Sequence, residues 1–136
     1  HPTSRFVAGF VGLSNVMTGT PAAIEGGCAS LDWNGVTVAV RTPPGASVGD
    51  RVDCFVKLEK MRVVAPGGAA QGENRVPGTL RDIIFKGSTA DYLVTLENGA
   101  ELMISEGSET MGFQRKDPLE VVWSAEAGAC FPAGGA

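Results

Sequence analysis

Two stretches of the chain, DRVDCFVKLE at residues 50–59 and DPLEVVWSAE at residues 117–126, share one layout at an offset of 67. Both begin with Asp, run through apolar residues at alternate positions, and end in Glu. A period of two is typical of a β-strand with one buried face. The apolar phase consists of Val52, Cys54, Val56 and Leu58 in the first copy and of Leu119, Val121, Trp123 and Ala125 in the second. The sequence therefore predicts the same strand twice.

The repeat extends upstream of these strands in both copies. A Gly-Thr pair at 19–20 recurs at 78–79, and an Asn-Gly pair at 34–35 recurs at 98–99, each Asn-Gly followed by an alternating apolar run. Asn-Gly is the dipeptide that a two-residue hairpin turn prefers, because both positions need positive φ. The offset grows from 59 to 64 to 67, which places the insertions in loops. We therefore predict two related halves rich in short strands.

The polar face of the repeated strand is interrupted once in each copy. The interruption is Phe55 in the first copy and Val122 in the second, and the two positions are equivalent in the repeat. One interpretation is that a covering loop buries both side chains. The other is that they mark the place where the halves, or two subunits, pack together, since paired apolar exposures often mark interfaces. Phe55 and Val122 are therefore candidate interface residues.

The alternating runs and many turn residues predict an all-β chain of two small barrels or one composite barrel. We expect a first half at residues 13–64, a flexible connector at 65–76, a second half at 77–132 and a frayed tail at 133–136. The stretch RFVAGFV at 5–11 differs, because Phe6 and Phe10 lie at i,i+4 and predict a short N-terminal helical segment. Such a helical face needs a partner to cover it.

Composition and charge exclude several classes of protein. With 136 residues, 43% hydrophobic and 19% charged, the chain has the balance of a globular protein. Its net charge of −4, with no basic patch, argues against nucleic acid as a partner. The longest apolar runs fall short of a membrane-spanning helix. The start HPTSRFVAGF has neither an initiator Met nor a leader pattern, so we expect a cut inside a longer chain.

The sequence offers little catalytic or metal chemistry. The single histidine is His1, and the chain contains no nucleophile elbow, Walker A or zinc-protease motif. Cys28, Cys54 and Cys130 match no metal-binding spacing, and we expect them to be small buried hydrophobes in a reducing cytosol. We therefore predict no catalytic residue, no metal site and no enzyme activity for this chain alone.

Four stretches carry a family resemblance. They are PTSRFVAGFVGLSNVMTG at 2–19, VGDRVDCFVKLEKMRV at 48–63, VPGTLRDIIFKGSTADYLVTLENGAELMI at 76–104 and DPLEVVWSAEAGACF at 117–131. In this order they resemble the C-terminal regulatory region of ATP-binding subunits of ABC-type importers, the transport-associated OB (TOBE) domain, in its spermidine/putrescine-type branch. One motif departs from the family, because Lys57-Leu58-Glu59 stands where the family has Arg-Pro-Glu, which removes a guanidinium able to bind in a bidentate way.

The resemblance implies two OB-like β-barrel elements that follow an ATPase domain. Residues 1–12 would end that domain as a linker helix, and Phe6 and Phe10 would face it. ATP and Mg are implied for the upstream domain, and no cofactor for this chain. The implied partners are that ATPase domain, a second copy in a homodimer and the membrane subunits of a transporter, at the cytoplasmic face of the plasma membrane. The candidate regulatory or ligand-binding residues by motif position are Lys57, Glu59, Trp123 and Glu126.

Two other hypotheses come from different classes. A free-standing tandem OB-fold protein that binds molybdate-type oxyanions would use Lys86-Gly87-Ser88 as its anion loop, so Lys86 and Ser88 are also candidates, although a plain turn is the other interpretation. An oligonucleotide-binding OB domain ranks last, because that activity relies on a positive groove and exposed aromatic platforms. The polyamine substrate is suggested by the resemblance alone.

Overall fold

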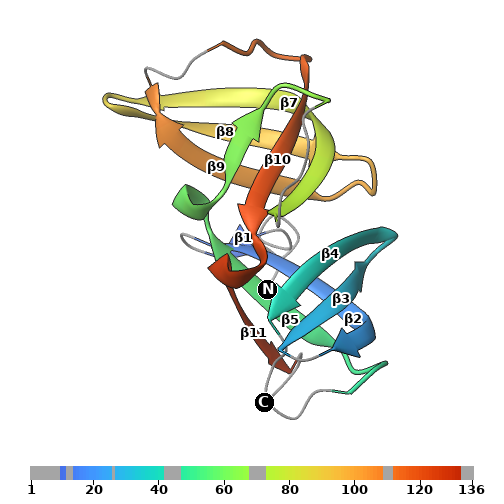
Figure 1. Ribbon diagram of the computed structural model, residues 1–136. Coiled ribbons are helices and arrows are strands. Elements are labelled where there is room, and N and C mark those ends of the chain that lie inside the picture. Colours follow the sequence, from blue (N-terminus) through green and yellow to red (C-terminus); the bar gives the residue numbers. More distant parts are fainter. Residues whose placement is uncertain are drawn as a thin grey trace, which may run out of the picture.

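In the computed structural model, the described residues are 10–11, 14–25, 27–41, 47–67, 73–108 and 112–132. They form eleven β-strands and short 3-10 turns, arranged as two curled sheets one above the other (Figure 1). Every strand pairing is antiparallel. The prediction of an all-β chain is confirmed.

The first sheet is the lower one in Figure 1. In spatial order its strands are β11 (Gly128–Pro132), β5 (Val52–Lys57), β2 (Ser14–Glu25), β3 (Cys28–Trp33) and β4 (Val36–Arg41), and β1 (Phe10–Val11) pairs with the start of β2. Asn34 and Gly35 connect β3 to β4 with φ of 52° and 93°, as a two-residue hairpin turn requires. The edge strands β4 and β11 approach each other, so the sheet curls on itself.

The second sheet repeats this order. Its strands are β6 (Arg62–Val64), β10 (Pro118–Ser124), β7 (Glu73–Lys86), β8 (Thr89–Leu96) and β9 (Glu101–Gly107), and its edges β6 and β9 also approach each other. The turn from β8 to β9 differs from our prediction. Only Gly99 has positive φ there, at 85°, while Asn98 does not. Asn98 instead accepts a hydrogen bond from the Ala100 N–H through Oδ1 at 3.0 Å, which closes a longer turn.

The first strand of each half bends at its Gly-Thr pair. β2 pairs with β5 up to Gly19 and with β3 from Thr20, and β7 changes partner in the same way at Gly78. A Cβ at Gly19 would lie 2.3 Å from the Asp32 carbonyl oxygen, and one at Gly78 would lie 2.6 Å from Val94 Cγ1. Glycine is therefore required at both bends, which gives a physical reason for the repeated Gly-Thr.

The two halves exchange their last strands. After β5, the 3-10 turn η3 (Leu58–Lys60) leads into β6, which pairs with β10 of the second sheet. After β10, the 3-10 turn η5 (Ala125–Ala127) leads into β11, which pairs with β5 of the first sheet. Figure 1 shows both crossings in the middle of the molecule. Each sheet is thus completed by a strand from the other half.

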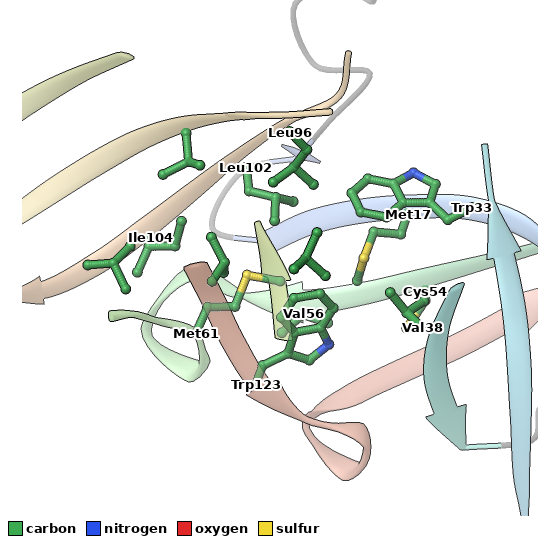
Figure 2. Close-up of a cluster of buried hydrophobic side chains, with 14 of the residues drawn as sticks. Met17, Trp33, Val38, Cys54, Val56, Met61, Leu96, Leu102, Ile104 and Trp123 are labelled. Atoms are coloured by element: carbon green, nitrogen blue, oxygen red, sulfur yellow. The ribbon is translucent and has the colours of Figure 1, made fainter. Parts of the chain in front are cut away.

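The predicted apolar phases are buried except for Ala125, which is half buried in η5. Val52, Cys54, Val56 and Leu58, and their counterparts Leu119, Val121 and Trp123, are all at most 7% exposed. One contiguous hydrophobic cluster contains buried residues from both sheets. Figure 2 shows Met17 and Trp33 of the first sheet in the same cluster as Leu102 and Ile104 of the second. The curled sheets therefore share their interior.

Two expectations need correction. Of the helical segment expected at residues 5–11, the structure describes Phe10 and Val11, and these form strand β1, paired with Ser14 and Asn15 of β2. The rest of that segment, Phe6 included, lies outside the described residues. The expectation that all cysteines are buried is wrong for Cys28, which is exposed at the start of β3, whereas Cys54 and Cys130 are buried.

Candidate functional site

Two buried asparagines join the halves through their backbones. Asn15 on β2 donates from Nδ2 to the Met103 carbonyl at 2.9 Å and accepts from the Met103 N–H at 2.8 Å. Asn74 on β7 does the same to Ala39 of β4, at 2.9 Å and 2.7 Å. An asparagine amide carries both a donor and an acceptor, so it can bind the N–H and the carbonyl of one residue. Because these groups are buried, losing either hydrogen bond would lower the stability of the fold. We call Asn15 and Asn74 the bridging asparagines.

The two Asn-Gly turns also meet. Asn34 donates from Nδ2 to the Asn98 carbonyl oxygen at 3.2 Å, and Asn98 donates from Nδ2 to the Trp33 carbonyl oxygen at 3.0 Å. Together with the bridging asparagines and the strand exchange, these contacts relate the two halves by an approximate twofold pattern. The junction between the halves is therefore an interface held by specific hydrogen bonds and not a flexible hinge.

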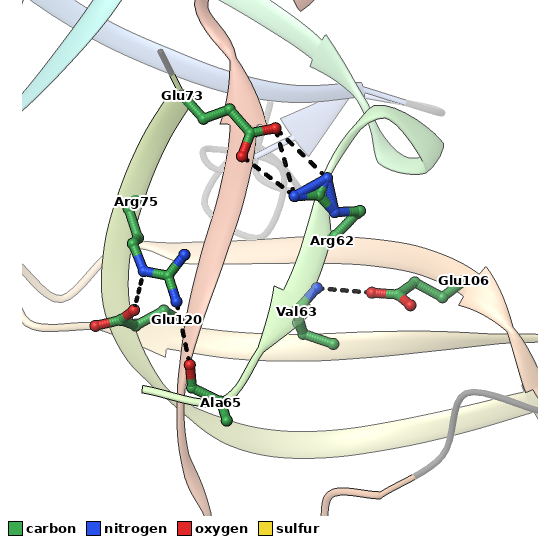
Figure 3. Close-up of polar contacts among 7 residues, drawn as sticks. All are labelled: Arg62, Val63, Ala65, Glu73, Arg75, Glu106 and Glu120. Atoms are coloured by element: carbon green, nitrogen blue, oxygen red, sulfur yellow. Dashed lines mark hydrogen bonds and ion pairs between the residues drawn. The ribbon is translucent and has the colours of Figure 1, made fainter. Parts of the chain in front are cut away.

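Charged side chains fix the exchanged strand β6 in the second sheet (Figure 3). Arg62 of β6 pairs with Glu73 of β7 at 3.2 Å. The Val63 N–H donates to Glu106 Oε2 at 2.6 Å, so β9 also holds β6. Arg75 pairs with Glu120 of β10 and donates to the Ala65 carbonyl oxygen at 3.2 Å. Since Arg62 is half exposed, its ion pair with Glu73 contributes little to stability. The hydrogen bond that the Val63 N–H donates to Glu106 and the one that Arg75 donates to the Ala65 carbonyl oxygen therefore define the position of β6.

Val122 is buried beneath this charged group. It is 0% exposed, and its neighbours across the sheet on either side are Arg62 and Arg75. Long arginine stems cover apolar surface while their charged heads remain in solvent. The equivalent Phe55 is only half buried and lies 5.9 Å, ring centroid to ring centroid, from Phe131, which is 54% exposed. The structure thus leaves apolar surface at Phe55 and removes it at Val122.

The family-motif candidates lie in or beside the matching 3-10 turns and differ in exposure. Lys57 and Glu59 flank the buried Leu58 at η3, and their exposed side chains make no hydrogen bond or ion pair with another described residue. At η5, Glu126 is exposed, and its N–H donates to Ser124 Oγ at 3.1 Å. Trp123 is 2% exposed in the core shown in Figure 2. The four residues therefore do not form one surface.

Lys86 and Ser88 lie at the tip of the β7–β8 hairpin. Lys86 Nζ contacts Asp91 Oδ2 at 2.7 Å, and Gly87 has φ of 79°. The Ser88 carbonyl oxygen accepts from the Ser108 N–H at 2.9 Å, which ties the tip to the end of β9. The loop is a turn whose cation already faces a carboxylate.

The bulge in β7 carries a charged contact to the loop before β10. Arg115 Nη2 lies 2.7 Å from Asp82 Oδ1, and the Ile83 N–H donates to the same oxygen at 2.9 Å. The hydrogen bond from Arg115, followed by that from the Ile83 N–H, lowers the pKa of Asp82 below its ordinary value. Because this carboxylate is at the surface, the contact orders the loop more than it stabilises the fold.

A recess opens at one end of the second sheet. It has a volume of about 320 Å³ and is lined by Pro66, Pro77, Gly78, Thr79, Thr95, Leu96, Glu97, Pro118 and Leu119. Thr95 Oγ1 is buried without a hydrogen-bond partner in this structure. Mostly apolar walls with a few polar atoms are typical of small-molecule sites. None of these residues was a candidate from the sequence.

The sequence analysis missed the bridging asparagines, although one signal for them was present. Asn15 and Asn74 are separated by 59 residues, the same offset as the Gly-Thr pairs.

Across the described ranges, no three His, Cys, Asp or Glu side chains are placed to hold a metal ion. The helices of this part of the chain include none that is long and apolar enough to cross a membrane.

Together, the two curled sheets and the internal repeat define a class of barrel-like β modules. The family model described as TOBE domain matches residues 55–131, more than half of the chain. The chain therefore belongs to the TOBE domain family.

Curated relatives match over nearly the whole chain. The spermidine/putrescine import ATP-binding protein PotA of Rubrobacter xylanophilus is 30% identical over 129 residues, which cover 91% of this chain and 33% of that protein. The protein of the same name from Pseudomonas aeruginosa is 30% identical over 132 residues, covering 93% of this chain and 36% of that protein. The chain thus spans about a third of the length of the curated relatives it matches.

A solved structure shares the fold. The cytoplasmic molybdate-binding protein ModG, in a crystal form with molybdate bound, superposes with a TM-score of 0.77 over 88% of this chain and 96% of that chain. The sequence identity is 19%. The likeness therefore shows a common arrangement of strands and no more.

Proposed function

We propose that this chain is the regulatory and oligomerisation domain of the ATP-binding subunit of an ABC-type importer for a polyamine-type substrate. The observation that carries the proposal is the match to PotA relatives across 91% of this chain and only 33% of the relative. The remaining two thirds of such a protein would hold the ATPase domain. Each sheet would then be an OB-like barrel element of the TOBE type.

In this proposal the chemistry lies outside the chain. ATP and Mg would be bound by the upstream ATPase domain, and the subunit would work at the cytoplasmic face of the plasma membrane, against the membrane subunits of the transporter. The chain would brace two ATPase subunits in a homodimer. The hydrogen bonds by which Asn15 and Asn74 join the halves support this role, because a domain that holds two subunits in a fixed arrangement needs halves that do not move relative to each other.

One described surface fits the contacts that this role needs. From the family resemblance, Phe6 and Phe10 would face the upstream ATPase domain, and Phe6 lies outside the described residues. Phe55, together with the exposed Phe131, would contact the second copy. Val122 lies under Arg62 and Arg75 and would support the sheet instead of the contact.

Regulatory contacts are proposed at the two 3-10 turns. Glu59 on η3 and Glu126 on η5 present charges at corresponding places in the halves, with Lys57 at the end of β5 beside η3. Trp123 holds η5 to the core. A regulator or small ligand with complementary charges would meet these side chains in solvent. The recess at Thr95 and Glu97 offers a separate place for a small molecule.

Immunoblotting of the source cells with an antibody against this chain tests the main proposal. We expect a band about three times 14.0 kDa, because the chain spans about a third of its relatives. The purified chain should show no ATP turnover. A native band at 14.0 kDa, or ATP hydrolysis by the chain alone, would overturn the proposal.

A free-standing binder of molybdate-type oxyanions is the second candidate, and the shared fold with ModG favours it. Lys86 and Ser88 would be its anion loop, although Lys86 already pairs with Asp91. Calorimetric titration with molybdate, tungstate and spermidine separates the two functions. Heat with the oxyanions that is lost in Lys86→Met would support this candidate, and no heat with either oxyanion would remove it.

A further inference from the structure

Two buried cysteines face each other across the exchanged strand. Cys54 lies on β5 and Cys130 on β11, and the two are direct partners in the register of this antiparallel pair. Their side chains are 1% and 9% exposed and belong to the same core cluster. Both are free thiols. The two positions come from opposite halves of the sequence repeat, so the facing pair exists only because the last strands are exchanged.

The geometry of this pair suits a disulfide. Directly opposed residues in antiparallel strands have Cα atoms about 4.5–5.5 Å apart. A disulfide spans Cα separations of about 4.4–6.8 Å. Cys54 Sγ leans toward β11, since a Cβ built at Gly128 would lie only 2.8 Å from it. The bond can therefore form with little movement of either strand.

The two thiols differ in reactivity. The hydrogen bond from the Cys54 thiol, together with the charge of Arg41 on β4, lowers the pKa of Cys130 in spite of burial. The contact with Cys130 and burial raise the pKa of Cys54. A thiolate is the nucleophile in cysteine oxidation. Cys130, the more exposed and more acidic thiol, is therefore the one that reacts first, and Cys54 is its resolving partner.

We propose that Cys54 and Cys130 form a reversible disulfide when the protein meets hydrogen peroxide. The Cys130 sulfur attacks one peroxide oxygen, the O–O bond breaks, and the released hydroxide takes up a proton to give water and a sulfenic acid. The Cys54 sulfur then attacks the Cys130 sulfur, the S–O bond breaks, and the hydroxyl leaves as water with the Cys54 proton. Two thiols lose two electrons, and one peroxide becomes two waters.

The disulfide would fix the strand exchange covalently. β11 is the end of the second half and is held in the first sheet by its pairing with β5. A bond from Cys130 to Cys54 would close a chain loop that contains the entire second sheet. Oxidation would therefore prevent β11 from leaving the first sheet, and reduction by a dithiol would remove this constraint.

The test is peroxide treatment of the folded Cys28→Ser variant, which keeps the facing pair and removes the exposed thiol. We expect loss of both thiols, a mass lower by two hydrogen atoms, a peptide that links the segments containing residues 54 and 130, and a higher thermal midpoint that dithiothreitol reverses. Circular dichroism before oxidation shows that the variant is folded.

Matched variants separate this reaction from simple over-oxidation. In Cys28→Ser/Cys54→Ser, we expect a sulfenic acid on Cys130 that a dimedone probe traps. In Cys28→Ser/Cys130→Ser, Cys54 should keep its thiol, because it has little access to solvent. A Cys28→Ser protein that gains oxygen atoms without forming the link, or that keeps both thiols until it is unfolded, would overturn the proposal.

Discussion

At the scale of single residues, the bridging asparagines contribute more to the contact between the two halves than any charged side chain does. Asn15 and Asn74 each satisfy one N–H and one carbonyl on a strand of the other half, and both are at most 8% exposed. Of the five ion pairs among the described residues, four have at least one side chain more than half exposed, and Arg75–Glu120 is the more buried exception. Exposed ion pairs contribute about 0–1 kcal/mol each. The amide contacts therefore contribute more than the exposed ion pairs do.

Replacement of Asn15 by Ala should lower the free energy of unfolding by about 2–4 kcal/mol, because two hydrogen bonds vanish and the Met103 groups lose their partner. Urea denaturation followed by circular dichroism measures the change. Asn74→Ala is the matched variant in the other half and should cost a similar amount. A loss below about 0.5 kcal/mol in both would contradict the importance assigned to these contacts.

At the scale of strands and turns, the bent first strand explains much of the repeat. β2 and β7 each serve two neighbours and carry a register shift two to four residues after the bend, between Pro21 and Ala23 and between Leu80 and Asp82. A bulge strengthens the local twist, and the glycine beside it lets the neighbouring strand approach. These two features allow a short sheet to curl on itself.

Gly19→Ala should destabilise the protein by about 1–3 kcal/mol, because the new methyl group would lie 2.3 Å from a backbone oxygen that cannot rotate away. Gly27→Ala is the control, since a Cβ there has no atom within 4 Å. Its effect should stay within about 0.5 kcal/mol. Equal melting temperatures for the two variants would show that the first sheet does not need its bend.

The strands were predictable from the sequence, and their partners were not. Alternation of apolar residues depends only on neighbours along the chain, so the buried phases of β5 and β10 matched the structure. β6 and β11 are short, and their place in the opposite sheet depends on pairing with distant residues. The Asn98 turn departed from its local preference because the Asn98 amide contacts Trp33 in the other half.

The candidate site was predictable in part. Motif position selected Lys57, Glu59 and Glu126, and the structure leaves their side chains exposed, where they can meet a partner. It also selected Trp123, which is buried, because a motif does not distinguish a contact residue from a packing residue. The interruption of the polar face selected Val122, which is buried as well. The exposed Phe131 was missed, since it lies in a strand whose partner was unknown from the sequence.

At the scale of the whole molecule, the shared core makes the two sheets one cooperative unit. Buried side chains from both sheets belong to one cluster, and each sheet contains a strand from the other half. Opening one sheet would therefore remove an edge strand from the other. Independent unfolding of the halves is not compatible with this connectivity.

The two tryptophans can test this cooperativity. Trp33 reports on the first sheet and Trp123 on the second, and both are at most 5% exposed. In the Trp33→Phe and Trp123→Phe variants, the remaining tryptophan should show unfolding at the same denaturant concentration as circular dichroism of the same variant. Two separated transitions within one variant would mean that the halves unfold independently.

The strand exchange also has a consequence for cutting the molecule. A backbone break anywhere between β6 and β7 would leave each fragment with a strand that completes its counterpart. Neither piece would have a closed sheet by itself, so the two would need to find each other in order to fold. The connection between β6 and β7 is therefore a natural split point for a complementation reporter, whose signal depends on reunion of the fragments.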